Sequence, residues 1–329
     1  YLTSCGTCEY CRKGETNMCA SRKGLGSAAD GYFANYCIAS AKYCHKLADD
    51  LSFEEGALAE PFACVVHAVC NLTHPMAGDL VLVVGPGPMG QMVAALAKAS
   101  GCVVVISGIN GDEERLRFAR ENYGIQHTVN SQETDLKAYL ESLSDGRGAD
   151  YVYDCTGAVP GILSGLDCCK RKGTFVAIGM NMGNIPLDYY NIVYKKEITI
   201  QGDKSTSTVT WARTLRIMNG KCVDLKPLIS EVIPMSKWKE GYETFRKAKG
   251  MKVIMHGDGV GADALERKGG KIFRRFKREH GEGGEVLLAA PVFLPAGVED
   301  QKVCGLDLRG MELEPRFGDL LSRKVGAVE

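Results

Sequence analysis

The chain has 329 residues, enough for about two domains that each bury a core. Lysine plus arginine equals aspartate plus glutamate at 40 each, so no global charge attracts nucleic acid or an acidic membrane surface, and a small-molecule substrate is favoured. The 14 cysteines lie scattered in apolar runs, without a signal peptide or an 18-residue apolar span. This pattern predicts a reducing, cytoplasmic setting.

Residues 1 to about 48 are rich in Gly and Cys, with short alternating runs that predict loops and short strands. A cysteine knuckle in this part has the spacing C-x2-C-x2-C-x7-C; its members are Cys5, Cys8, Cys11 and Cys19. Four thiolates at this spacing can close a tetrahedral shell around Zn²⁺, and a closed shell indicates a structural zinc. The alternatives are four unrelated reduced cysteines or a ferredoxin-type cluster. The cluster fits less well because the last spacer is seven and no Pro follows.

The run from Glu60 to His67 holds a carboxylate, a thiol and an imidazole within eight residues. Cys64 and His67 follow Glu60 by four and seven positions, so all three can share one helix face. By itself the run is equally consistent with a helix start that has an acidic first turn, Pro61 at the first helical position and a buried cysteine.

From Asp79 onward, buried apolar strands alternate with helical stretches, which predicts an α/β fold with a Rossmann doubly wound parallel sheet. Six strands are expected, at Leu80–Val84, Cys102–Ile106, His127–Val129, Asp150–Tyr153, Thr174–Ile178 and Glu197–Ile200. Helices are expected at Gln91–Ser100, Glu113–Asn122, Trp211–Met218 and Lys237–Lys247, with further strands near Leu228–Ile233 and Met251–Met255. Residues 257–329 show no sustained period and stay unassigned.

A glycine turn follows the first of these strands and opens a helix; it consists of Gly85, Pro86, Gly87, Pro88, Met89 and Gly90. This context predicts a dinucleotide pyrophosphate at the helix N-terminus, whereas an ordinary glycine-rich turn is the alternative. No Lys-Ser/Thr pair follows Gly90, which excludes a nucleoside-triphosphate P-loop. Thr156 and Gly157 end the fourth strand and Gly179 ends the fifth, as cofactor contacts or as plain turns.

The acid that marks NAD at the end of the second strand is missing, because Ser107 and Gly108 stand there. A small uncharged strand end tolerates a 2′-phosphate, and Arg115 in the next helix can neutralise one. NAD and NADP both stay open.

From residue 1 to about 256 the chain resembles the zinc-dependent medium-chain alcohol dehydrogenases, especially the sorbitol and threonine dehydrogenase branch. The resemblance rests on the cysteine knuckle, Asp30-Gly-x-Phe-Ala-x-Tyr36, Glu55-Gly-Ala-x-x-Glu60-Pro61, the glycine turn and Asp154-x-Thr-Gly157. It implies a partial, β-rich GroES-like catalytic domain (residues 1–60 and 203–256, with the zinc lobe at 5–19) and a Rossmann domain (61–202).

The resemblance also implies a function: NAD(P)-dependent oxidation of a secondary alcohol or polyol by a homodimer or homotetramer. Glu60 is then a ligand or close neighbour of a catalytic zinc, and His67 faces the nicotinamide or the substrate. The family's other catalytic-zinc ligands lie upstream of the knuckle, and its chains end near residue 256. We therefore expect a truncated chain with an unrelated tail, 257–329, that binds cofactor with little or no alcohol oxidation. A non-catalytic dinucleotide-binding protein with structural zinc only, and a zinc-independent reductase, are the alternatives.

Overall fold

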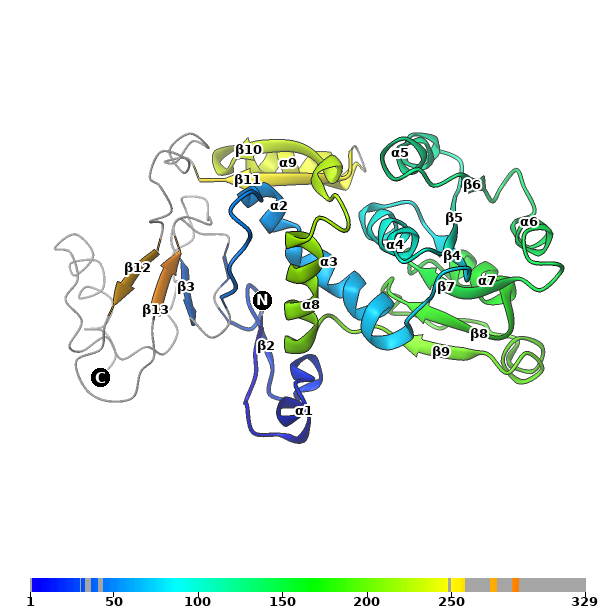
Figure 1. Ribbon diagram of the computed structural model, residues 1–329, viewed down its shortest axis with the longest axis horizontal. Helices are drawn as coiled ribbons and strands as arrows, with labels where there is room; N and C mark the ends of the chain where they lie inside the picture. The colour runs from blue at the N-terminus through cyan, green and yellow to red at the C-terminus, as the bar shows by residue number, and fades with distance from the viewer. Residues whose placement is uncertain are drawn as a thin grey trace. The chain divides into compact units, whose positions relative to one another are not determined.

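The computed structural model describes residues 2–29, 31–32, 37–40, 44–247, 250–257, 273–276 and 286–289 (Figure 1). The chain divides into two compact units: residues 1–22, 47–232 and 239–254 form the first, and residues 23–46, 233–238 and 255–329 the second. All candidate site residues belong to the first unit. No helix within the described ranges combines the length and the apolar character that a membrane crossing requires.

A six-stranded sheet in the order β6-β5-β4-β7-β8-β9 forms the centre of the first unit. Its strands are β4 (Leu80–Val84), β5 (Val103–Gly108), β6 (His127–Asn130), β7 (Ala149–Asp154), β8 (Cys169–Ala177) and β9 (Thr199–Gly202). Every neighbouring pair is parallel. The strand order reverses between β4 and β7, where doubly wound sheets bind their ligands at the carboxyl ends of the strands. The predicted Rossmann sheet and its six strands are confirmed.

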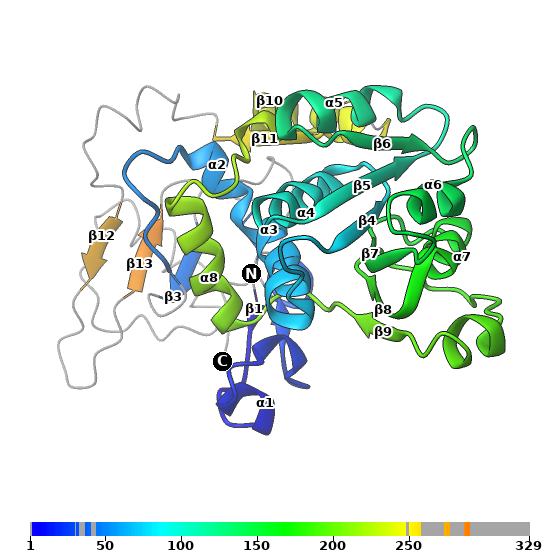
Figure 2. The ribbon, with the colours of Figure 1, turned by 45° about the vertical axis from the view of Figure 1, so that its right-hand side comes forward.

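Helices cover both faces of this sheet (Figure 2). They are α4 (Pro88–Ala99) and α5 (Glu113–Tyr123) on one face, and α6 (Leu136–Ser142) and α7 (Val159–Cys168) on the other. The alternation of side chains along β4 explains the two layers: Val81 and Val83 join the core beneath α4 and α5, while Leu82 joins the core beneath α6 and α7. Sequence analysis predicted α4 and α5 but missed α6, which has seven residues, and α7, which contains two glycines.

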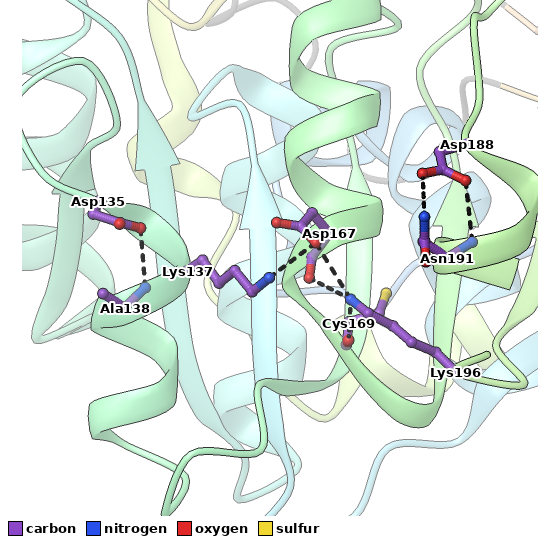
Figure 3. Close-up of polar contacts among 8 residues, drawn as sticks. All are labelled: Asp135, Lys137, Ala138, Asp167, Cys169, Asp188, Asn191 and Lys196. Atoms are coloured by element: carbon purple, nitrogen blue, oxygen red, sulfur yellow. Dashed lines mark hydrogen bonds and ion pairs between the residues drawn. The ribbon is translucent and has the colours of Figure 1, made fainter.

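Polar contacts join α6, α7 and the segment after β8 (Figure 3). Lys137 of α6 donates to a carboxylate oxygen of Asp167 in α7 at 3.1 Å. Lys196 donates to the main-chain carbonyls of Asp167 at 2.6 Å and Cys169 at 3.2 Å. The π-helix Tyr189–Tyr194 (η4) precedes Lys196, and Asp188 caps it through the N–H of Asn191. These contacts hold the segment between β8 and the edge strand β9 against α7.

A long helical segment leads into the sheet. It comprises α2 (Phe53–Ala57), α3 (Ala59–Val66) and the π-helix η3 (His67–Thr73), and it packs with α8 (Thr208–Asn219) in the core that also contains α4. The remaining elements are β1 (Leu2–Thr3), α1 (Glu9–Arg12), η1 (Thr16–Met18), β2 (Lys23–Gly24), η5 (Lys226–Leu228), β10 (Ile229–Pro234), η6 (Met235–Lys237), α9 (Trp238–Arg246) and β11 (Lys252–His256).

The second unit contains a three-stranded antiparallel sheet. Its strands, in the order β12-β13-β3, are β12 (Phe273–Phe276), β13 (Val286–Ala289) and β3 (Cys37–Ser40). Two of the three come from residues 257–329, which sequence analysis left unassigned.

Candidate functional site

The glycine turn between β4 and α4 owes its shape to its glycines. Gly85 has φ of +97°, and a Cβ there would lie 2.5 Å from Cγ2 of Thr156. A Cβ on Gly90 would lie 1.9 Å from the carbonyl oxygen of Gly85. At Gly87, by contrast, the nearest atom to an added Cβ is Nη1 of Arg115 at 3.9 Å. The turn is therefore closed by its outer glycines and open at the middle one, where a ligand can reach the backbone.

The start of α4 offers amide hydrogens at this opening. Gly87 is the N-cap, no side chain caps the helix, and Pro88 stands in the first turn. The first N–H groups of a helix have no intrahelical partner, so those of Met89 and Gly90 can receive an anion together with the positive end of the helix dipole. The N-terminus of α4 is therefore suited to bind a phosphate group.

A buried glutamine that sequence analysis missed holds the turn in place. Gln91 is fully buried, and its Nε2 donates to the carbonyls of Pro86 and Arg115, both at 2.9 Å. It thereby ties the glycine turn to the first turns of α5. The available signal was a polar residue directly before the apolar run from Met92 to Ala97.

The ends of β7 and β8 meet beside the glycine turn. The buried carboxylate of Asp154 accepts hydrogen bonds from the hydroxyl of Thr156 at 2.6 Å, the N–H of Thr156 at 3.0 Å and the N–H of Gly157 at 3.1 Å. A Cβ on Gly179 would lie 2.1 Å from the nitrogen of Gly157, so the two backbones touch. The structure thus brings Thr156, Gly157 and Gly179 to the same edge as Gly85.

The last two residues of β5, Ser107 and Gly108, offer no charged side chain to a ligand. The hydroxyl of Ser107 is buried and donates to the carbonyl of Val83 at 3.4 Å, so it faces the neighbouring strand. Gly108, the last residue of β5, carries no side chain. Arg115 of α5 faces the carboxylate of Asp112 at 3.9 Å.

The cysteine knuckle forms around α1 and η1. Its four sulfur atoms lie within 4.8 Å of one another, with Cys5 Sγ 3.8 Å from Cys11 Sγ and 3.6 Å from Cys19 Sγ. Tetrahedral zinc with bonds of about 2.3 Å requires sulfur separations of about 3.8 Å, so the four thiols fit this ion. The N–H groups of Thr7 and Cys8 and the hydroxyl of Thr7 lower the pKa of Cys5 to about 5, whereas hydrogen bonds with the other thiols and burial raise the pKa of Cys8 to about 11. Without a metal the four thiols therefore share their protons unevenly, and zinc binding would release the protons that remain.

The knuckle has little apolar support of its own, since α1 contains no buried residue. Polar contacts connect it to the start of α8: the hydroxyl of Thr16 lies 3.2 Å from that of Thr208, and Asn17 donates to the carbonyl of Lys204 at 2.9 Å. A bound metal would therefore be the main source of local order.

Glu60 stands in the first turn of α3, half-buried among ionisable groups. Burial raises its pKa, and the ammonium group of Lys252 partly offsets this. One turn later, burial together with the charges of Glu60 and Asp203 raises the pKa of Cys64 to about 12, so this thiol is protonated. Asp203 follows β9 directly; burial raises its pKa to about 7, and its buried Oδ1 accepts no hydrogen bond. Sequence analysis missed Asp203, although an acid directly after a strand end was a usable signal.

His67 lies at the start of η3 and contacts α8. Its Nδ1 is 3.1 Å from the hydroxyl of Thr210, and burial lowers its pKa, which favours the neutral imidazole. Among the described residues, only the four knuckle cysteines form a group of three or more potential metal ligands. Glu60, Cys64 and His67 do not converge on one point, and a contact of His67 with nicotinamide or substrate stays a prediction.

Two family models match the chain. One described as "Zinc-binding dehydrogenase" matches residues 88–219, and one described as "Alcohol dehydrogenase GroES-like domain" matches residues 1–49. Sorbitol dehydrogenase of Halalkalibacterium halodurans is 37% identical over 252 residues, which cover 76% of this chain and 73% of the relative. L-Threonine 3-dehydrogenase of Yersinia pestis is 30% identical over 257 residues, which cover 78% and 73%.

Solved structures share the fold. A short chain alcohol dehydrogenase (rspB) from E. coli CFT073, complexed with NADH, aligns with a TM-score of 0.71 and 20% identity, covering 77% of this chain and 74% of that one. A zinc-binding dehydrogenase from Sinorhizobium meliloti, bound to NADP, aligns with a TM-score of 0.69 and 24% identity over the same shares, 77% and 74%. The two cofactors differ, so the shared fold leaves the choice between NAD and NADP to local residues.

Proposed function

Because the chain belongs to the zinc-dependent medium-chain alcohol dehydrogenases, in the sorbitol and threonine dehydrogenase branch, we propose that it transfers hydride between a secondary alcohol or polyol and NAD(P). The glycine turn carries this proposal. It stands at the switch point of the sheet, closed at Gly85 and Gly90 and open at Gly87. An ordinary turn between a strand and a helix has no need of that opening.

The chain's own residues have distinct parts in holding the dinucleotide. The N–H groups of Met89 and Gly90 receive the pyrophosphate, and Gly87 lets it approach the backbone. Thr156, Gly157 and Gly179 border the nicotinamide side, where Asp154 fixes the loop. When bound, NAD(P) supplies the acceptor for the hydride, while the protein supplies position and charge.

We assign the cysteine knuckle to a structural zinc, because four thiolates close its coordination shell. Glu60 is our candidate for the catalytic centre, as a carboxyl whose raised pKa and neighbouring ammonium group suit it to hold or pass a proton. The described residues do not complete a second zinc site around it, so we derive no step through a second zinc.

Turnover with and without Glu60 tests the enzymatic proposal. Sequence analysis expected little or no alcohol oxidation by this chain, whereas the enzymatic proposal requires the purified chain to reduce NAD(P) with sorbitol, threonine or a related secondary alcohol. The Glu60→Gln variant should lower kcat at least about 100-fold while the affinity for NADH changes little, since general acid–base groups contribute about that factor. Glu54→Gln, a nearby carboxyl in α2, is the control. Equal loss in both variants, or none in either, would contradict the role of Glu60.

A non-catalytic dinucleotide-binding protein with one structural zinc is the second candidate, supported by the single ligand cluster among the described residues. Metal analysis with fluorescence titration of NADH separates the two. One zinc per chain with dinucleotide binding and no turnover favours the second candidate. Two zinc ions with turnover favour the enzyme and mean that Glu60 has further ligands.

Finer assignments follow from the same proposal. We assign residues 61–202 to the dinucleotide-binding domain, and residues 1–60 and 203–256 to the catalytic domain. We propose a homodimer that pairs along β9, an edge strand whose Ile200 is exposed. Light scattering should give twice the chain mass, and Ile200→Lys should give the monomer. The reduced cysteines suit a cytoplasmic protein.

A further inference from the structure

Sequence analysis found no acidic residue at the end of β5. In the structure, the carboxylate of Asp112 lies at this strand end. An ideal Cβ built on Gly108 would lie 2.8 Å from Cβ of Asp112, 3.1 Å from its Oδ2 and 3.1 Å from Cγ of Pro86. Asp112 therefore fills the space into which a side chain at the strand end would grow. Because Pro86 borders the same space, this carboxylate stands directly beside the glycine turn.

Asp112 is held in this orientation. Its Oδ2 accepts a hydrogen bond from the N–H of Ile109 at 3.1 Å, and its Oδ1 faces Nη1 of Arg115 at 3.9 Å. Although Asp112 is the N-cap residue of α5, its side chain makes no capping bond to the helix. The carboxylate is turned back toward β5, and its side chain is 21% exposed, which leaves room for a ligand.

The surroundings of Asp112 are fixed to the glycine turn. Gln91 donates to the carbonyl of Pro86, which borders the space that Asp112 fills, and to the carbonyl of Arg115, three residues after Asp112. On the other flank, the N–H and the hydroxyl of Ser131 donate to the carbonyl of Gly108, at 2.9 and 3.0 Å. The strand end, the turn and the first turn of α5 thus form one bonded unit.

In Rossmann folds, an acid at the end of the second strand accepts the ribose hydroxyls of NAD, and its charge opposes the 2′-phosphate of NADP. We propose that Asp112 performs this task here and makes the site selective for NAD over NADP. This inference rests on dinucleotide binding at the glycine turn. Arg115, which alone would attract a 2′-phosphate, has its charge offset by Asp112.

Fluorescence titration of the full chain with NADH and NADPH tests the inference. The unmodified protein should bind NADH at least about tenfold more tightly than NADPH, the scale of one charge-assisted hydrogen bond. Asp112→Asn keeps the acceptor for Ile109 but removes the charge, so it should weaken NADH about tenfold and bring the two affinities to within about threefold. Glu114→Gln removes an exposed charge from the same helix turn and should leave the ratio unchanged.

A transfer of the acid gives a second, independent readout. In Gly108→Asp combined with Asp112→Gly, the new side chain enters the space that Asp112 vacates, and the preference for NADH should return. Equal binding of NADPH by the unmodified chain, or an unchanged ratio in Asp112→Asn, would overturn the inference while leaving dinucleotide binding intact. If the unmodified chain binds neither dinucleotide, the proposed function itself fails.

Discussion

The glycine turn and the cysteine knuckle both suit a charged ligand, but they obtain their shape from opposite sources. The turn stands on a strand whose five residues are all buried, and contacts as short as 1.9 Å to an added Cβ fix its backbone. The knuckle has no buried residue in α1, and its order comes from sulfur atoms that gather where a metal would bind. The core therefore forms the cofactor site, whereas we expect the knuckle to depend on its zinc ion.

Metal removal should separate the two regions most clearly. Structural zinc contributes on the order of 10 kcal/mol to the folding of small metal-dependent segments, and little else supports residues 5–19. Cys19→Ser should therefore lose the zinc and expose this segment to protease, while NADH affinity stays within about twofold, because the turn lies in the separate Rossmann core. Metal content, limited proteolysis and NADH titration measure this. Cys222→Ser, an exposed cysteine elsewhere, is the control.

Loss of both zinc and NADH binding would contradict the independence of the two regions. If Cys19→Ser abolished NADH binding together with the zinc, the knuckle would support the cofactor site as well, and the two regions would not be independent.

A pair of glycine variants tests the claim that core packing forms the turn. Gly90→Ala places a Cβ against the carbonyl of Gly85 and should lower the free energy of unfolding by about 3 kcal/mol, with loss of NADH binding. Gly87→Ala meets nothing closer than 3.9 Å and should leave stability unchanged, yet it should weaken NADH because the backbone is then less accessible. Urea denaturation and NADH titration separate the two effects. Equal destabilisation by both variants would refute the open-centre geometry.

Asp203, directly after the edge strand β9, tests whether a carboxyl whose buried Oδ1 accepts no hydrogen bond destabilises the fold. The pKa of Asp203 is about 7 in the folded chain, against an ordinary value of 3.8 in the unfolded chain. At a pH between these two values the folded chain keeps the proton of this carboxyl, whereas the unfolded chain has lost it. The free energy of unfolding therefore falls as pH rises from about 4 to 7. Asp203→Asn should remove this slope and add about 2 kcal/mol at pH 8, about half of what the full shift allows because the side chain is partly exposed.

Urea denaturation at pH 5 and pH 8 measures the slope. Asp50→Asn provides a control of opposite sign, because its hydrogen bond with Lys221 lowers the pKa of Asp50 and stabilises the fold at neutral pH. If Asp203→Asn lost stability at pH 8, the carboxylate would have a partner that offsets its burial.

The parts predicted well from sequence are those with a strong local pattern. The run Leu80–Val84 predicted β4 with its bounds, and the C-x2-C-x2-C-x7-C spacing predicted a cluster that the sulfur positions allow. Asp112 shows where such reasoning stops: its carboxylate reaches the strand end only because Gly108 leaves the space empty and Ile109 donates to it. A side chain that turns back over four residues leaves no periodic signal.

The groups that surround Glu60 could not be predicted from the sequence for a related reason. Asp203 and Lys252 are 143 and 192 positions away from Glu60 along the chain, yet their charges act on the same group of buried side chains. Only the packing of α3 against later segments brings them together, and this follows from the tertiary fold rather than from any local motif.

The smallest expected effect concerns the link between the turn and α5. Gln91→Leu keeps the volume of the side chain but leaves the carbonyls of Pro86 and Arg115 without their donor, so the free energy of unfolding should fall by about 1–2 kcal/mol. NADH should also bind less tightly, because the turn and Asp112 lose their common support. Gln126→Leu, at an exposed position, should change neither quantity. A stable Gln91→Leu variant with unaltered NADH affinity would mean that the glycines alone hold the turn and that its bond to α5 is dispensable.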